Sequence, residues 1–136
     1  MDYCKAAFGG VALYRDEDAA VKFVLNFVLM DNRVQELVQL VVDGSAFGGI
    51  EGEPGWMLER RDVADESNHT AYPDWPAGAR FKASVDEDAY RLEQPEYFMS
   101  RETFMKYLIL AIDAYVAADP SRAEAPAVVA LRKAIA

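Results

Sequence analysis

The sequence predicts an α+β fold: an N-terminal helix pair, then a small antiparallel sheet of three to four strands, then one long and one short C-terminal helix. The 136 residues are 52% hydrophobic and 27% charged, which is typical of a single globular domain over residues 1–136. Helical spacing of hydrophobic residues is found toward both ends, whereas alternation with a period of two is confined to the middle. Helices and strands segregated along a chain favour α+β over a parallel sheet.

Two helices are expected near the N-terminus. Acidic residues 16–18 precede an apolar run from Val21 to Met30, and carboxylates stabilise the positive end of a helix. A second, amphipathic helix is expected over residues 34–42, where Val and Leu recur at helical spacing. Gly44 ends it, because glycine readily adopts the left-handed conformation found at helix C-termini.

The middle of the chain indicates loops and short strands. Residues 47–78 are rich in Gly, Pro, Asp and Glu, which indicates long surface connections with one short strand at residues 56–59. Residues 80–85 alternate between polar and hydrophobic side chains and predict a half-buried strand.

Two further strands are expected before the next helix. The acidic run Asp86-Glu87-Asp88 is expected to turn the chain into a strand that directs Tyr90 and Leu92 inward. Residues 97–99 form a third short run. Strands this short and this close in sequence fit an antiparallel sheet.

The C-terminal part begins with the clearest helix signal. Ser100 can accept hydrogen bonds from the first free amides, and Glu102 favours the same helix end. The helix is expected to run to about Ala118, where Asp119-Pro120 stops it, and a last helix starts at about Pro126. The main hydrophobic stripe consists of Phe104, Leu108, Ile112 and Tyr115, widened by Met105, Ile109 and Val116.

The chain is acidic, and its acids are unevenly distributed. It has 14 Lys and Arg against 23 Asp and Glu, a net charge of −9, and such a field repels phosphate backbones, so direct nucleic-acid binding is not expected. Residues 51–96 hold twelve of the acids with Trp56, Tyr72 and Trp75 among them. This stretch is either a solvated, loop-rich surface or a docking face for a cationic partner, which acids steer and aromatic residues anchor.

Reactive groups are few. His69 is the only histidine, and a hydrolytic triad would need Ser67 and either Asp65 or Glu66 beside it. Residues this close in sequence rarely adopt the geometry of a proton relay. A zinc site needs more than one Cys and one His, and no calcium-binding loop is visible, so neither a metal nor a cofactor is expected. The alternative is a small enzyme or ligand-binding domain that uses the loop around His69.

The expected compartment is the cytoplasm. Cys4 is the only cysteine and cannot form an internal disulfide, which favours a reducing environment. The first residues lack the cationic start and apolar run of a signal peptide. The most apolar stretch, Phe23 to Met30, is far shorter than the roughly 20 residues needed to cross a bilayer, so no membrane association is expected.

Several short motifs taken together resemble a known family. These are Tyr14-Arg15-Asp16-Glu17, then Asp43-Gly44-Ser45-Ala46-Phe47-Gly48, then Tyr97-Phe98-Met99-Ser100 leading into Phe104, Tyr107-Leu108, Ala111 and Tyr115. In this order, over about residues 14–136, the chain resembles the ribonuclease-toxin immunity proteins of bacterial contact-dependent growth inhibition. The resemblance implies a small cytosolic protein that binds the C-terminal nuclease domain of a cognate toxin and has no catalytic activity.

The matched motifs are scaffold residues, so the charge pattern has to locate the binding surface. A nuclease that handles RNA needs a cationic cleft, and an inhibitor can place carboxylates where phosphates would lie. The expected toxin-binding residues are the acids and aromatic residues of the central stretch: Glu51, Glu53, Trp56, Asp62, Asp65, Glu66, Tyr72, Trp75, Asp86, Glu87 and Asp88.

Overall fold

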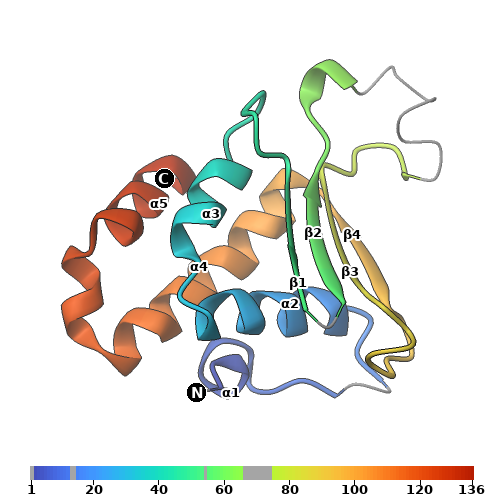
Figure 1. Cartoon of the computed structure of the whole chain (residues 1–136), viewed down its shortest axis with the longest axis horizontal. Helices are drawn as coiled ribbons and strands as arrows, with labels where there is room; N and C mark the ends of the chain where they lie inside the picture. The colour runs from blue at the N-terminus through green and yellow to red at the C-terminus, as the bar shows by residue number, and fades with distance from the viewer. Residues whose placement is uncertain (1, 13–14, 54, 66–74) are drawn as a thin grey trace.

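A computed structural model describes residues 2–12, 15–53, 55–65 and 75–136 and confirms the α+β class. Helices lie on one side of the molecule and a four-stranded sheet on the other (Figure 1). The elements are α1 (Cys4–Phe8), α2 (Ala19–Met30), α3 (Val34–Leu40), β1 (Gly49–Gly52), β2 (Trp56–Arg60), the short 3-10 helix η1 (Val63–Asp65), β3 (Phe81–Val85), β4 (Glu96–Met99), α4 (Arg101–Ala118), the 3-10 helix η2 (Pro120–Glu124) and α5 (Pro126–Ile135).

The sheet is an antiparallel meander in the order β1-β2-β3-β4. Its inner face carries the buried side chains of alternate residues, including Trp56 and Leu58 on β2 and Phe81 and Ala83 on β3. Helix α2 packs against β2, β3 and β4, and α4 reaches β4, so the helices cover this inner face (Figure 1). Alternation leaves the intervening side chains on an outer face that no described helix covers.

Two helix predictions are confirmed, but only one of the two expected side-chain caps forms, because Asp18 at the N-cap of α2 makes no side-chain capping hydrogen bond. Helix α2 follows the acidic turn, and Val24 and Val28 on it are completely buried. Helix α4 begins after Ser100, whose hydroxyl oxygen accepts a hydrogen bond from the Thr103 amide at 3.2 Å. The stripe on α4 is narrower than expected, because Ile109 is 42% exposed.

Two strand expectations are wrong. Residues 47–52 are not only a surface connection, because they include β1, which pairs with β2. Residues 90–92 form no strand: the amides of Ala89 and Tyr90 both donate to the Asp86 carbonyl, which holds the chain in a turn. The Tyr90 ring still packs inward, at 4.6 Å from the ring of Phe23.

None of the helices in the described part of the chain combines the length and the hydropathy that crossing a membrane requires.

Candidate functional site

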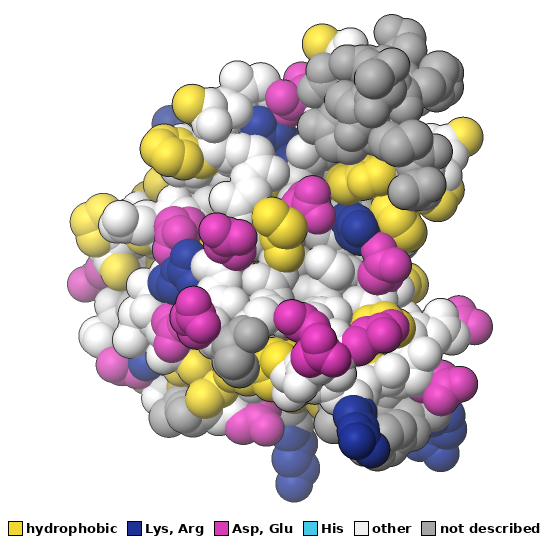
Figure 2. Space-filling view, turned by 45° about the vertical axis from the view of Figure 1, so that its right-hand side comes forward, with side chains coloured by type: hydrophobic (Ala, Val, Ile, Leu, Met, Phe, Trp, Pro, Cys, Tyr) yellow, Lys and Arg dark blue, Asp and Glu magenta, His cyan; other side chains and the backbone are white. Residues whose placement is uncertain are grey.

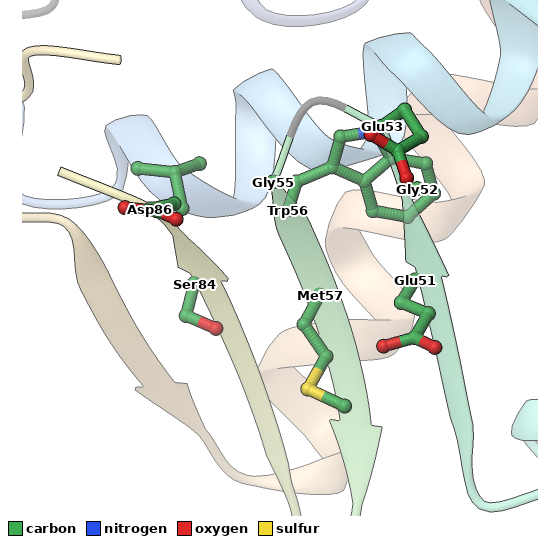
Figure 3. Close-up of a pocket in the computed structure, with 9 residues that line it drawn as sticks. Glu51, Gly52, Glu53, Gly55, Trp56, Met57, Ser84 and Asp86 are labelled. Atoms are coloured by element: carbon green, nitrogen blue, oxygen red, sulfur yellow. The ribbon is translucent and has the colours of Figure 1, made fainter. Parts of the chain in front are cut away.

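An open hollow of about 660 Å³ lies at one end of the outer sheet face, where β1 turns into β2 and β3 ends (Figure 3). Three of its side chains come from outward positions that face one another across the strands: Glu51 is paired with Met57, and Met57 with Ser84. Directly opposed side chains on one face of an antiparallel sheet lie within contact distance. The remaining lining residues are strand ends and turn residues: Gly52, Trp56 and Val85 at the ends of β1, β2 and β3, and Glu53, Gly55 and Asp86 beyond them.

Five acidic residues gather here, and we call them the acidic end: Glu51, Glu53, Asp86, Glu87 and Asp88. The first three line the hollow, and the other two continue the chain from Asp86. All five are exposed, and within the described residues none takes part in an ion pair. No described cation therefore forms a close ion pair with a residue of the acidic end. Figure 2 brings this side of the molecule forward and shows more acidic than basic side chains on it.

One backbone hydrogen bond and one glycine bring the two acidic turns together, and a side-chain hydrogen bond closes the second turn. The Asp86 amide donates to the Gly55 carbonyl at 2.7 Å, and the Asp86 side chain accepts from the Asp88 amide at 2.9 Å. Gly55 has a φ of 150°, and a Cβ there would lie 2.7 Å from the Cβ of Asp86. Glycine therefore permits the close approach of the β1–β2 turn to the end of β3.

Trp56 is a core residue and not a surface anchor, which corrects the sequence-based expectation. It is 2% exposed and its indole stacks on Phe27, with ring centroids 6.5 Å apart. The Arg33 guanidinium lies 5.2 Å from the indole centroid, and Gly52 lies directly against the ring. A side chain this enclosed cannot insert into a partner without unfolding its own strand.

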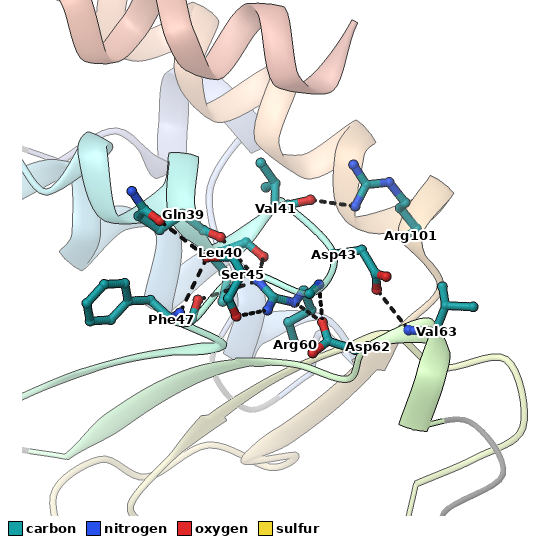
Figure 4. Close-up of polar contacts among 11 residues, drawn as sticks. Gln39, Leu40, Val41, Asp43, Ser45, Phe47, Arg60, Asp62, Val63 and Arg101 are labelled. Carbon is teal, nitrogen blue, oxygen red and sulfur yellow. Dashed lines mark hydrogen bonds and ion pairs between the residues drawn. The ribbon is translucent and has the colours of Figure 1, made fainter.

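The structure also corrects the expectation for Asp62, which lies at the opposite end of the sheet from the acidic end. Its carboxylate forms hydrogen bonds within the protein (Figure 4). One carboxylate oxygen accepts from Arg60 Nε at 2.6 Å and from the Gly44 amide at 2.8 Å. Burial opposes its charge, but these hydrogen bonds and the Arg60 charge outweigh it and hold the pKa of Asp62 below its ordinary value.

Trp75 is half-buried and lies apart from the acidic end. Its ring packs edge-on against Phe98 on the outer face, at 5.4 Å between centroids. Phe98 is paired with Lys82, and Lys82 forms a 2.7 Å ion pair with Glu96. This part of the outer face is therefore partly neutralised, unlike the acidic end.

Several expected residues fall outside the described part of the chain. These are Glu66, His69 and Tyr72, together with the side chain of Asp65, whose backbone ends η1. The alternative site around His69 falls outside it as well. In the described ranges, no group of three or more His, Cys, Asp or Glu side chains is arranged to hold a metal ion.

Met57 is the site residue that sequence reasoning missed. It is half-buried and lines the hollow from β2, the middle one of three strands, between Glu51 and Ser84 (Figure 3). The sequence held a signal for this position. On a strand, side chains alternate between the two faces, so if Trp56 and Leu58 point inward, Met57 between them points outward.

No protein-family model matches this chain, and no curated protein or solved structure is significantly similar to it.

Proposed function

We propose that this domain is a cytoplasmic immunity protein that binds a bacterial nuclease toxin domain, a ribonuclease, through the acidic end and performs no reaction itself. The observation that supports the proposal best is the gathering of Glu51, Glu53, Asp86, Glu87 and Asp88 around one open hollow, where none of them forms an ion pair within the described residues. The resemblance to immunity proteins of contact-dependent growth inhibition supports the same class of partner.

The electrostatics favour a partner with a cationic cleft. Exposed carboxylates without ion-pair partners remain solvated in the free protein and are ready to meet Lys or Arg side chains. Opposite potentials accelerate diffusional encounter, by factors of about 10 to 1,000 at low salt. A ribonuclease cleft is cationic because it binds the phosphates of RNA, so carboxylates placed there would exclude the substrate.

The hollow also offers an apolar contact. Interfaces commonly combine apolar contacts with a polar rim, and here the apolar Met57 lines the hollow beside Glu51. A flexible thioether adapts to partner surfaces of irregular shape. Met57 therefore takes the anchoring role that the sequence had assigned to Trp56.

The partner can be sought in the toxin encoded beside the gene for this chain. Its terminal domain should co-purify with the wild-type protein and lose its ribonuclease activity. The triple variant Glu51→Lys/Glu53→Lys/Glu87→Lys should bind at least about 100-fold more weakly, because like charges then face the cleft. It spares Asp86, whose side chain holds the turn.

The matched control reverses three exposed acids on α4 and η2: Glu102→Lys/Asp113→Lys/Glu124→Lys. It has the same net charge as the test variant and should bind like the wild type within about threefold, since the surface ion pairs it breaks contribute little. Equal weakening in both triple variants would show that only net charge matters, and unimpaired binding of the test variant would exclude the acidic end as the interface.

Replacing His69 by Ala separates this proposal from an enzyme that uses the loop around that residue. Neutralisation of the toxin domain should be unchanged in His69→Ala. Loss of a catalytic rate by orders of magnitude in this variant would instead favour the enzyme.

A further inference from the structure

Four of the nine arginines of this acidic chain line one hollow of about 490 Å³, which we call the arginine hollow: Arg60, Arg61, Arg80 and Arg101. It lies where β2 ends and β3 begins, at the opposite end of the sheet from the acidic end. One aspartate, Asp43, is the only acidic residue among its described lining. The described lining therefore holds four basic residues and one acidic residue, on a molecule with a net charge of −9.

Arg60 lines this hollow and has a structural role (Figure 4). Arg60 is 4% exposed, and its guanidinium donates to the carbonyls of Leu40 at 2.7 Å and Ser45 at 2.8 Å, and to Asp62. These bonds leave little capacity for a ligand. Arg61 and Arg80 also take part in interactions within the protein. They add positive charge to the lining of the hollow, but we assign them no contact with a ligand.

Arg101 differs from the other three. It is exposed, and its only described hydrogen bond is to a neutral group, the Val41 carbonyl at 2.7 Å (Figure 4). A guanidinium has five N–H donors in a planar fork that matches carboxylate and phosphate oxygens. Arg101 is also the first residue of the 18-residue helix α4, so the positive end of that helix lies beside the hollow.

The rim of the arginine hollow is apolar. Val42 is 48% exposed and Val63 is 58% exposed, and both line the hollow. Apolar side chains left in water beside an arginine favour a ligand that carries its charge on a hydrophobic group.

We propose that the arginine hollow binds a small organic anion, a carboxylate or a phosphate monoester carried on an apolar group, with Arg101 holding the charged end and Val42 and Val63 contacting the apolar end. This site is independent of the acidic end, so the toxin-binding proposal can fail without affecting it. Binding should weaken with salt, because the attraction is between charges near the surface.

Titration of the whole protein at low salt with phenyl phosphate, benzoate and inorganic phosphate tests this site, by calorimetry and by amide chemical shifts. Phenyl phosphate or benzoate should bind more tightly than inorganic phosphate, and the stronger of the two identifies the preferred charged group. The shifts should be concentrated around Arg101 and Val63. Failure of all three probes to bind saturably, or shifts located elsewhere, would overturn the proposal.

Two variants assign the contacts. Arg101→Gln should weaken binding at least about tenfold, the effect expected when a charged hydrogen bond is lost. The control Arg91→Gln removes an exposed guanidinium from the β3–β4 connection and should change affinity by less than about twofold. Val63→Ser should weaken phenyl phosphate binding but not that of inorganic phosphate. Equal losses in both arginine variants would contradict a site at Arg101.

Discussion

Gly52 allows the acidic end to form because it has no side chain that would clash with Trp56. A Cβ at this position would lie 2.3 Å from Cζ2 of Trp56 and 2.6 Å from its Nε1. The indole cannot move aside easily, because it is enclosed and stacked on Phe27. The glycine is thus required for β1 to cross over the tryptophan and carry Glu51 and Glu53 to the hollow.

Gly52→Ala should accordingly lower the free energy of unfolding by about 1–3 kcal/mol, the usual cost of overpacking. Gly49→Ala is the control on the same strand, since its nearest atom to a new Cβ is the Leu58 carbonyl oxygen at 3.8 Å. Urea unfolding of both variants measures the difference. Equal stability of the two variants would show that the Trp56 indole can move to accommodate the added methyl group.

Cys4 is predicted to be unreactive in the folded protein. Burial, with a smaller contribution from the neighbouring carboxylate of Asp2, raises the pKa of its thiol to about 12. Only the thiolate attacks disulfide reagents, so at about pH 8 the native protein should react far more slowly than the urea-unfolded chain. Native and unfolded chains reacting at the same rate with an aromatic disulfide would contradict the burial of Cys4.

Asp62 should make stability depend on acid pH. Its pKa is held below the unfolded value, so at acid pH the unfolded chain binds protons that the folded chain does not. The contribution is complete above the ordinary carboxyl pKa of about 4 and is lost as pH falls through the lower, folded pKa. Urea unfolding between neutral and acid pH should show a smaller acid loss for Asp62→Asn than for the wild type.

At the scale of elements, Arg60 fixes α3 to the sheet. Its guanidinium donates to the Gln39 and Leu40 carbonyls at the C-terminal end of α3 and to Ser45 in the following loop. The Leu40 carbonyl lies in the last turn of α3, where carbonyls lack a partner within the helix, whereas the Gln39 carbonyl also accepts from the Val42 amide. A cation placed there satisfies the Leu40 carbonyl and opposes the negative end of the helix dipole.

Arg60→Gln should therefore lower the free energy of unfolding by about 3 kcal/mol or more, because several buried acceptors lose their donor together. Arg91→Gln, at an exposed position, should change it by less than about 0.5 kcal/mol. Unfolding in urea followed by circular dichroism gives both values. A small effect of Arg60→Gln would show that water replaces the guanidinium at the end of α3.

The elements that sequence reasoning found are those with local physical signals. Ser100 marked the start of α4 through a hydrogen bond within one turn, and the alternation in residues 80–85 marked β3. Strand β1 was missed because its four residues, Gly49–Gly52, have too little hydrophobic pattern and depend on pairing with β2. The false strand near Tyr90 arose because inward packing of that ring was attributed to alternation, whereas it contacts Phe23 from a turn.

At the scale of the whole molecule, the sheet separates charges that lie close together in sequence. Antiparallel pairing puts Trp56 opposite Val85 at one end and Arg60 opposite Phe81 at the other. Glu53 and Asp86 consequently share a hollow, while Asp62 lies with the arginines. Sequence reasoning singled out acids that line this hollow but could not sort them between the two ends of the sheet, because strand register determines their positions.

The kinetics of toxin-domain binding test the central claim most directly. Association rates measured by stopped flow at increasing salt should fall steeply for the wild type and for the control Glu102→Lys/Asp113→Lys/Glu124→Lys. For Glu51→Lys/Glu53→Lys/Glu87→Lys the rate at low salt should be lower by about tenfold or more and nearly independent of salt, because steering toward the acidic end is lost. An unchanged rate and an unchanged salt dependence in this variant would contradict binding through the acidic end.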